Sequence, residues 1–469
     1  MARDVRKETP GVTRLILEAA KKAREESSAE PEPGLTKPIH WPVDCNIGPG
    51  LEGAIACESR IGYVNGSKGW LIYRGYDIFD LCAYACFEEV SYLLLKGKLP
   101  TKRQLEEYKK TLVEYRFVPN TVRHLLSFPV QEMNTMAALR IGCMMMRQVL
   151  SYADQESSRP LPRTAIGTDE DSIPMETEPW GEEHAVYEFK PKELKRPKDA
   201  RETQDAGSGL QGCNRLVAGL PTLAAAIARV RQEKLPVEPD RELSHAGNLL
   251  YMMTGERPSA LHERIMDVCL ILHADHGMNA STFAAMVVAS TLSDVYFSAG
   301  AGIAALNGPL HGGANERVVN VLREIADPKR VKGWYRKARE RRQKIMGFGH
   351  RVYKAYDPRA RVLGPLAKHL AKKSKEAAHL YKTARALEKE VLATLGKEKS
   401  IFPNVDFFSG IVYAGMGIPP SMFTPIFAVS RVVGWSARML EYLENNRIFR
   451  PRAMYVGPLD KKFVPIEKR

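Results

Sequence analysis

Three short loops carry the residues of this chain that are best suited to proton chemistry. His311 lies in NGPLHGGAN, His350 lies in GFGHRVYKAYDPR, and Asp406 follows FPNV in a stretch rich in apolar side chains. Glycines beside both histidines permit tight turns that would expose the imidazoles. An imidazole titrates near neutral pH, and burial makes a carboxylate a stronger base by raising its pKa. A turn histidine or a helix-capping aspartate would explain each residue alone, whereas the three together predict a site that moves protons.

Several arginines indicate that the ligand of such a site is an anion. Arg359 ends the loop of His350, and Arg431 and Arg450 lie in the C-terminal section. The planar guanidinium group binds a carboxylate through two parallel hydrogen bonds, so a set of arginines predicts a dicarboxylate. Each of them could also be an ordinary surface cation.

A third histidine of interest is His276, the last residue of HADH. His273 lies three positions earlier, on the same face of an expected helix. Zinc would need a third ligand, and no flanking cysteine or glutamate has suitable spacing. We therefore expect His276 to hydrogen-bond a substrate or a core partner, and we predict no metal site. The sequence contains no P-loop, dinucleotide-binding or nucleophile-elbow motif.

The charge of the chain indicates a polyanionic partner. The 469 residues carry a formal net charge of +14. Residues 331–400 hold 20 lysines and arginines against 6 acids, an excess equal to the surplus of the whole chain. Nucleic acid and a phosphorylated small molecule both fit this excess, and a solvated lysine-rich helix face explains part of it.

Composition also bears on the compartment. The chain has 44% hydrophobic and 26% charged residues, which is typical of a globular protein. It has no run of about 20 apolar residues that would predict a membrane-spanning helix, and no apolar signal core near its start. Seven scattered cysteines without a CxxC pair predict free thiols. We expect a cytoplasmic location.

Helices should position the three loops. Apolar residues recur at helical spacing over much of the chain, whereas strand signals are confined to the hairpin pattern around Asn65-Gly66. These features predict an all-α fold with a short N-terminal β-hairpin region. Residues 1–40 form a charged N-terminal extension that we expect to be mobile or loosely docked, and residues 151–208 are interpreted as a polar insertion. The expected helices include 104–115, 122–128, 135–150, 222–231, 243–254, 261–273, 280–306, 316–325, 366–395 and 422–442.

Taken together, the motifs resemble the citrate synthase family. GPLHGGAN, GFGHRVYK..DPR, FPNVDFFSG, HADH..NAST and the closing R..GW and RPR follow the family's pattern, between Gly53 and Gly457. The resemblance implies a two-domain helical homodimer whose small domain closes over the substrates. We expect a large domain formed by residues 41–310 and 416–469 and a small domain formed by residues 311–415.

The resemblance also implies the chemistry, which is condensation of acetyl-CoA with oxaloacetate and water to give citrate and CoA. Asp406 would remove a proton from the thioester methyl group, and His311 would hydrogen-bond the enolate oxygen. His350 would polarise and protonate the carbonyl group of oxaloacetate. A weakly acidic C–H bond needs such a base and such an enolate stabiliser, so the reading from residue types agrees. No metal or redox cofactor is implied, because the coenzyme A thioester is itself a substrate.

Six further residues are implied in binding. Three would hold oxaloacetate, one matches an arginine that the family supplies from the neighbouring subunit, and two would contact coenzyme A; they are His276, Arg359 and Arg431, then Arg450, then Lys354 and Asn404. The phosphates of coenzyme A would then be the partner of the basic segment 331–400. Nucleic acid becomes a minor alternative.

Two other functions stay open at this point. A 2-methylcitrate synthase would use propionyl-CoA, and one extra methylene changes discrimination by only about 1–3 kcal/mol. A basic, non-catalytic binding protein on the same fold would bind nucleic acid with a steep salt dependence and release no thiol. The sequence also departs from the family at Arg438, where many relatives carry a histidine (GWSAR rather than GWxAH).

Overall fold

The computed structural model of the chain describes residues 4–27, 36–151, 209–458 and 461–469. Helices dominate these residues, and the one sheet among them has three short strands. The prediction of an all-α fold with a short β-hairpin region is confirmed. Apart from its first residue, the predicted insertion 151–208 lies outside the described residues. Within the described ranges, no helix combines the length and the apolar character needed to cross a membrane.

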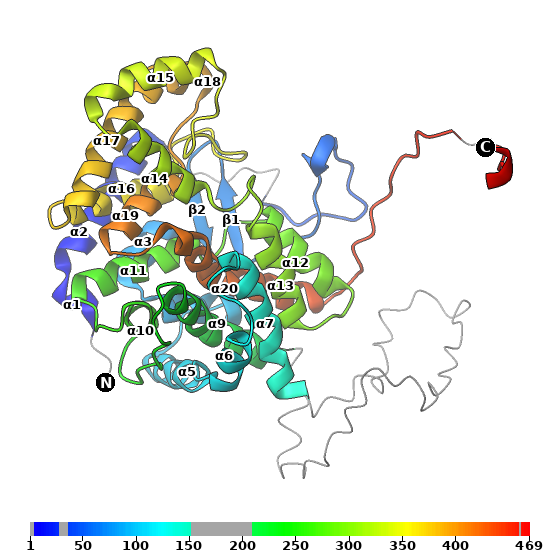
Figure 1. Cartoon of the computed structure of the whole chain (residues 1–469), viewed down its shortest axis with the longest axis horizontal. Coiled ribbons are helices and arrows are strands. Elements are labelled where there is room, and N and C mark those ends of the chain that lie inside the picture. The colour runs from blue at the N-terminus through cyan, green and yellow to red at the C-terminus, as the bar shows by residue number, and fades with distance from the viewer. Residues whose placement is uncertain (1–3, 28–35, 152–208, 459–460) are drawn as a thin grey trace, which may run out of the picture.

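The helices pack together into one body, and α20 lies among them (Figure 1). Their bounds in chain order are α1 Val5–Glu8, α2 Pro10–Glu26, α3 Ile78–Tyr84, α4 Phe87–Lys96, α5 Lys102–Tyr115, α6 Pro119–Leu125, α7 Thr135–Ser151, α9 Leu210–Val230, α10 His245–Thr254, α11 Ala260–His273, α12 Ala280–Ser290, α13 Val295–Leu306, α14 Ala314–Ile325, α15 Val331–Glu340, α16 Pro358–Leu370, α17 Lys375–Val391, α18 Lys397–Lys399, α19 Val405–Gly415 and α20 Phe423–Leu443. Most of the expected helices occur with shifted ends, and neither α15 nor α19 was among the expected ones.

The sheet follows the Asn-Gly hairpin signal. Its strands pair antiparallel in the order of the chain and are β1 (Gly62–Asn65), β2 (Trp70–Tyr73) and β3 (Tyr76–Asp77). Asn65 closes the first turn, since its side-chain oxygen accepts from the backbone N–H of Lys68 at 3.0 Å. Asp77 ends the sheet and caps α3 by accepting from the N–H of Phe79 at 2.8 Å. The sheet therefore leads directly into the helical body.

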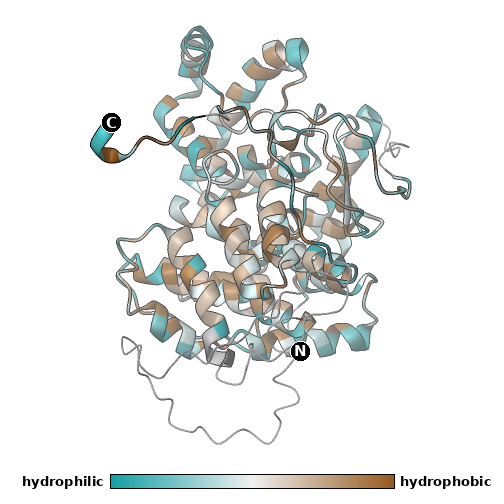
Figure 2. Ribbon diagram, turned by 90° about the vertical axis from the view of Figure 1, so that its right-hand side faces the viewer, coloured by the Kyte–Doolittle hydropathy of each residue, from teal (hydrophilic) through white to brown (hydrophobic). Residues whose placement is uncertain are grey.

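The central helix of the molecule is α20. It packs against α4, α9, α11, α12 and α13, and most of its residues are buried, including Trp435. Figure 2 shows hydrophobic residues gathered on the helices in the middle of the molecule and hydrophilic residues on its outer parts. Arg431 and Arg438 are buried in the same helix. Buried arginines need polar partners, so these two indicate a polar site against α20.

The N-terminal helices are docked on the body. Helix α2 packs against α3 and α16, and its Val12 and Ile16 are buried. Glu26 at its end pairs with Arg361 of α16. The prediction of a mobile or loosely docked segment was therefore wrong for residues 4–27. The apolar stripe of α2 finds its partners in helices that are remote in sequence, which a local pattern does not reveal.

The sequence predicts a helix over residues 222–231 that starts after Pro221. In the structure Pro221 instead lies inside α9. An interior proline removes a backbone hydrogen bond and costs about 3 kcal/mol in an exposed helix. Here α9 is buried almost throughout and packs on α5, α7, α10 and α20. Tertiary packing therefore outweighs the local preference of the proline.

Two long expected helices are each broken into shorter ones. The range 280–306 divides into α12 and α13, because Leu292 has a positive φ of 65° and Asp294 caps α13. The range 366–395 divides into parts of α16 and α17, and Ser374 caps α17. Both breaks occur at a side chain that accepts a hydrogen bond from the first turn of the next helix.

Helices α14, α16, α17 and α19 pack on one another and lie together in Figure 1. All four belong to the predicted small domain, 311–415. The bounds of the large and small domains stay a prediction.

Candidate active site

His350 is held as a neutral hydrogen-bond donor. Its Nδ1 accepts from the backbone N–H groups of Val352 at 3.0 Å and Tyr353 at 3.1 Å. The hydrogen of the ring therefore lies on Nε2. Burial, helped by the cation of Arg359, lowers the pKa of His350 to about 4. At neutral pH the ring presents an uncharged Nε2–H.

Hydrogen bonds join the loop of His350 to the loop of Asp406. The backbone N–H of Asn404 donates to the carbonyl oxygen of Gly347 at 2.9 Å. The side-chain nitrogen of Asn404 donates to the carbonyl oxygen of Gly349, also at 2.9 Å. Both glycines have positive φ, 80° and 79°, which glycine adopts without strain. Donor and base are thus fixed relative to each other.

Asp406 has the environment of a general base. It is half-buried near the start of α19, and its backbone N–H donates to the capping side chain of Asn404 at 3.1 Å. Burial raises the pKa of Asp406 to about 6, although the cations of Arg359 and Arg431 act in the opposite direction. The carboxylate is ionised at pH 7 and is a stronger base than an exposed aspartate.

His311 is fixed by the first turn of α12. Its Nε2 accepts from the backbone N–H of Ser281 at 3.2 Å and lies 2.8 Å from the hydroxyl of the same residue. Trp435 of α20 donates to that hydroxyl at 3.2 Å. Because a backbone donor faces Nε2, the hydrogen of the ring lies on Nδ1. Burial, with a smaller contribution from Arg431, lowers the pKa of His311 to about 4.

Tyr353 brings His276 beside His350. The phenol oxygen lies 3.2 Å from Nε2 of His276, and the two imidazole centres are 5.1 Å apart. The guanidinium carbon of Arg359 is 5.9 Å from the centre of the same tyrosine ring. Burial lowers the pKa of His276 well below its usual value, so it too is neutral. His276 and Tyr353 lie 77 positions apart in the sequence, and the fold brings them into one polar cluster.

The two site arginines differ in how far the protein satisfies them. Arg359 is buried and donates from Nε and Nη2 to the carboxylate of Asp357 at 3.0 and 2.8 Å. Arg431 donates from Nε to the carbonyl oxygen of His273 at 2.5 Å. Nη2 of Arg431 is buried and has no hydrogen-bond partner among the described residues. A buried guanidinium nitrogen without a partner is costly, and an anionic ligand would satisfy it.

Arg431 also links the parts of the site. Its charge lowers the pKa of His276, His311 and Asp406, which therefore lie around it. The structure thus places these residues near His350 and Arg359, and the role assigned to each of them stays a prediction. Within the described ranges no three His, Cys, Asp or Glu side chains are grouped to hold a metal ion.

Three predicted binding residues lie apart from this cluster or have other partners. Lys354 has an exposed side chain, and its backbone N–H donates to Gly66 at 2.9 Å. Asn404 uses its side chain to cap α19 and to brace Gly349. Arg450 is exposed on the C-terminal segment, which runs away from the body (Figure 1). Their assigned roles stay predictions.

Most of the chain is similar in sequence to known proteins. The family model described as "Citrate synthase, C-terminal domain" matches residues 50–452. The chain belongs to the citrate synthase family. Citrate synthase 2 of Bacillus subtilis is 40% identical over 421 residues, covering 90% of this chain and 98% of that protein. A 2-methylcitrate synthase of Shewanella oneidensis is 35% identical over 423 residues, covering 90% and 98%.

Solved structures of citrate synthases show the same fold. The enzyme from Pyrobaculum aerophilum superposes with a TM-score of 0.74 at 40% identity, covering 92% of this chain and 100% of that one. The enzyme from Thermoplasma acidophilum, solved as a ternary complex with carboxymethyl coenzyme A and oxaloacetate, gives a TM-score of 0.74 at 32% identity, covering 91% of this chain and 100% of that one. The expectation of a citrate synthase-like fold is confirmed.

Some residues of the site were missed by sequence reasoning. Tyr353 and Ser281 hold the histidines in place, yet a tyrosine in a loop and a serine in a helix start carry no distinctive signal. Asp357 had no role of its own in the prediction from the sequence, but its carboxylate binds Arg359 and accepts from the N–H of Val405 at 3.2 Å. Its position two residues before an arginine was the available clue.

Proposed function

We propose that the protein condenses acetyl-CoA with oxaloacetate and water to give citrate and free CoA. One arrangement carries the proposal. Two neutral imidazoles, His350 and His311, each have a defined N–H for a ligand, and they share the site with Asp406, a carboxylate of raised pKa. Abstraction of a proton from a weak carbon acid needs this combination of base and uncharged donor.

The first step is enolisation of the thioester. Asp406 takes a proton from the methyl group of acetyl-CoA, and the thioester oxygen gains negative charge. Nδ1–H of His311 donates a hydrogen bond to that oxygen. Because the backbone N–H of Ser281 occupies Nε2, the imidazole keeps the tautomer that this step requires. Burial strengthens the hydrogen bond, since little water competes for it.

The second step forms the carbon–carbon bond. The enolate carbon attacks the carbonyl carbon of oxaloacetate, and Nε2–H of His350 polarises the carbonyl oxygen and supplies its proton. The product of this step is citryl-CoA. Water then cleaves the thioester bond to give citrate and free CoA, and this hydrolysis drives the sequence forward.

Oxaloacetate would be held by three residues around this point. Arg431 offers its unpartnered Nη2 to a carboxylate, and Arg359 offers Nη1, because Asp357 occupies its Nε and Nη2. His276 would donate to the carbonyl or a carboxylate from the same side as His350. Two cations facing a dicarboxylate give the site its charge balance.

Coenzyme A would extend from the site over the basic segment 331–400, with Lys354 beside its phosphates and Asn404 near its acyl end. Lys354 is exposed and follows the loop of His350, which supports this direction. A condensation of this kind uses no metal or redox cofactor, and that assignment is part of the proposal.

We also propose a homodimer in which Arg450 reaches the site of the neighbouring subunit. The C-terminal segment leaves the body (Figures 1 and 2). It exposes apolar side chains, among them Met454 (90% exposed) and Val456 (95% exposed). Apolar side chains on an extended segment are expected to be covered by another surface. All seven cysteines are free, which supports a reducing, cytoplasmic location.

A free-thiol assay tests the reaction and its substrate. The protein is mixed with oxaloacetate and either acetyl-CoA or propionyl-CoA, and kcat/KM is compared. We expect acetyl-CoA to be preferred, whereas a higher value with propionyl-CoA would assign 2-methylcitrate synthesis. The similarity to the 2-methylcitrate synthase keeps that alternative in view. Absence of thiol release with both thioesters would contradict the proposal and favour a non-catalytic binding protein.

A further inference from the structure

One face of α20 holds the turn that follows α11. Arg431 donates from Nε to the carbonyl oxygen of His273 at 2.5 Å. One turn further along, the backbone N–H of Gly434 donates to the carbonyl oxygen of Ala274 at 3.1 Å. A Cβ at Gly434 would lie 2.3 Å from that oxygen, so only glycine permits the contact. Successive turns of α20 therefore fix successive residues of one short segment.

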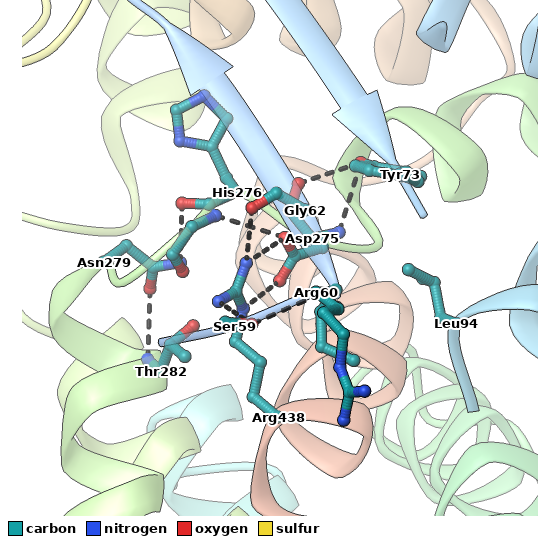
Figure 3. A network of polar contacts seen from close by, with 12 residues as sticks. Ser59, Arg60, Gly62, Tyr73, Leu94, Asp275, His276, Asn279, Thr282 and Arg438 are labelled. Atoms are coloured by element: carbon teal, nitrogen blue, oxygen red, sulfur yellow. Dashed lines mark hydrogen bonds and ion pairs between the residues drawn. The ribbon is translucent and has the colours of Figure 1, made fainter. Parts of the chain in front are cut away.

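The next contact on this face is a buried ion pair. Nε and Nη2 of Arg438 donate to Oδ1 and Oδ2 of Asp275, both at 2.8 Å (Figure 3). Arg438 also donates to the hydroxyl of Ser59 at 3.1 Å and to the carbonyl oxygen of Gly62 at 3.4 Å. Both members of the pair are buried, and Asp275 is fully so. The pair joins α20, the turn after α11 and the first strand.

Asp275 is held at its backbone as well. The hydroxyl of Tyr73 donates to its carbonyl oxygen at 2.8 Å, and its own N–H donates to that hydroxyl at 3.2 Å. Its carboxylate accepts from the N–H of Gly277 at 3.2 Å, which closes the turn around His276. The residue in the middle of this turn is thus the histidine that faces Tyr353. A shift of Asp275 would move His276 directly.

Charge gives the pair a second effect. Asp275 lies near Arg431, whose Nη2 is the unpartnered donor of the site. Although burial acts in the opposite direction, Arg438 holds the pKa of Asp275 below its usual value, so the carboxylate stays ionised. If Arg438 were neutral, the negative charge of Asp275 would act on Arg431 alone and reduce its attraction for an anion.

We propose that Arg438 and Asp275 are a positioning pair for oxaloacetate, which places His276 and keeps Arg431 available for a carboxylate. Neither residue needs to touch the substrate. The inference rests on the proposed function in its choice of ligand. It predicts that the pair governs affinity for oxaloacetate and has little effect on the acyl-CoA, which binds on the side of His311 and Lys354.

The test uses Arg438→Met, which keeps the length of the side chain without its charge, Asp275→Asn, and the double variant. Arg438→Met should raise KM for oxaloacetate by about 10- to 100-fold, because small displacements of positioning groups have effects of this size. KM for acetyl-CoA should stay within about twofold of wild type. The double variant should recover part of the loss, since it removes the unpaired carboxylate. Arg438→Lys, which keeps the charge but not the two parallel bonds, should lie between wild type and Arg438→Met.

A matched control comes from α11, the helix that precedes the turn of Asp275. Arg264 and Asp267 form another buried ion pair at 2.6 Å, near the start of α11 and away from the turn. Arg264→Met should lower the melting temperature and leave KM for oxaloacetate unchanged. Equal KM values for oxaloacetate in wild type and Arg438→Met, or equal rises for both substrates, would overturn the proposal. If Arg438→Met does not fold, Asp275→Asn supplies the same comparison.

Titration calorimetry with oxaloacetate separates this inference from the proposed reaction. Binding of oxaloacetate needs no turnover, so a protein that binds it but releases no thiol contradicts the reaction alone. A wild type that releases thiol while Arg438→Met binds oxaloacetate with unchanged Kd contradicts the positioning pair alone.

Discussion

The side-chain nitrogen of Asn404 lies 2.9 Å from the carbonyl oxygen of Gly349, which it binds as a donor. The same side chain caps α19 through the N–H of Asp406 at 3.1 Å. One amide therefore sets the distance between the assigned base and the loop that presents His350. The predicted contact of Asn404 with coenzyme A would come in addition to this internal role.

Asn404→Ala should impair both functions of that amide. Loss of a helix cap costs about 1 kcal/mol of unfolding free energy, and loss of the bond to Gly349 adds a similar amount. We expect a lower melting temperature and a fall in kcat, measured by thermal denaturation and the thiol assay. Asn404→Asp keeps the cap but not the donor, so it should recover stability more than kcat. Wild-type kcat in both variants would contradict the bracing role.

The pH dependence of the reaction should follow Asp406. A general base acts in its ionised form, so kcat/KM for acetyl-CoA should rise with pH through about 6 and then level off. His311 and His350, with pKa values of about 4, are already neutral there and should add no step between pH 6 and 8. A pH–rate profile measured with saturating oxaloacetate checks this. A midpoint near 4 would contradict the raised pKa that the structure gives to Asp406.

The same raised pKa should weaken the folded state. The folded protein binds the proton of Asp406 more tightly than the unfolded chain does. The contribution of Asp406 to the free energy of unfolding therefore falls as pH rises from about 4 to about 6. Asp406→Asn removes this penalty and should melt at a higher temperature than wild type at pH 7, with no advantage at pH 4. Differential scanning calorimetry at the two pH values compares them. A lower melting temperature at pH 7 would contradict the environment described for this carboxylate.

Helix α2 should contribute to stability in spite of its charged sequence. Ile16 is fully buried against the body, whereas its neighbour Leu17 is 36% exposed. Ile16→Ala should cost about 2–5 kcal/mol of unfolding free energy, and Leu17→Ala less than about 1 kcal/mol. Chemical denaturation of both variants measures the difference. Equal, small effects would mean that the N-terminal helix is loosely attached after all.

Mixed dimers test whether Arg450 acts across the subunit boundary. Asp406→Asn and Arg450→Ala chains should each have little activity alone. In a mixed dimer, one site combines an intact Asp406 with the intact Arg450 of the other chain, so mixing after mild dissociation should restore activity. No recovery, with mixed dimers verified by mass, would show that Arg450 serves its own subunit.

The reach of sequence reasoning differs between elements. The loops of His311 and His350 could be found because glycines and a lone imidazole stand out locally, and the helical class follows from apolar spacing. The docking of α2 and the interior position of Pro221 could not, because each depends on helices far away in the chain. Tyr353 was equally hidden, since its value comes from lying between His276 and Arg359 in space.

The most direct test of the central claim is oxaloacetate-dependent release of CoA from acetyl-CoA, with the product identified by mass spectrometry. Wild type should release CoA and form citrate in equal amounts, and Asp406→Asn should lose nearly all turnover while still binding oxaloacetate in calorimetry. Release of CoA without citrate, or substantial turnover by Asp406→Asn, would contradict the account.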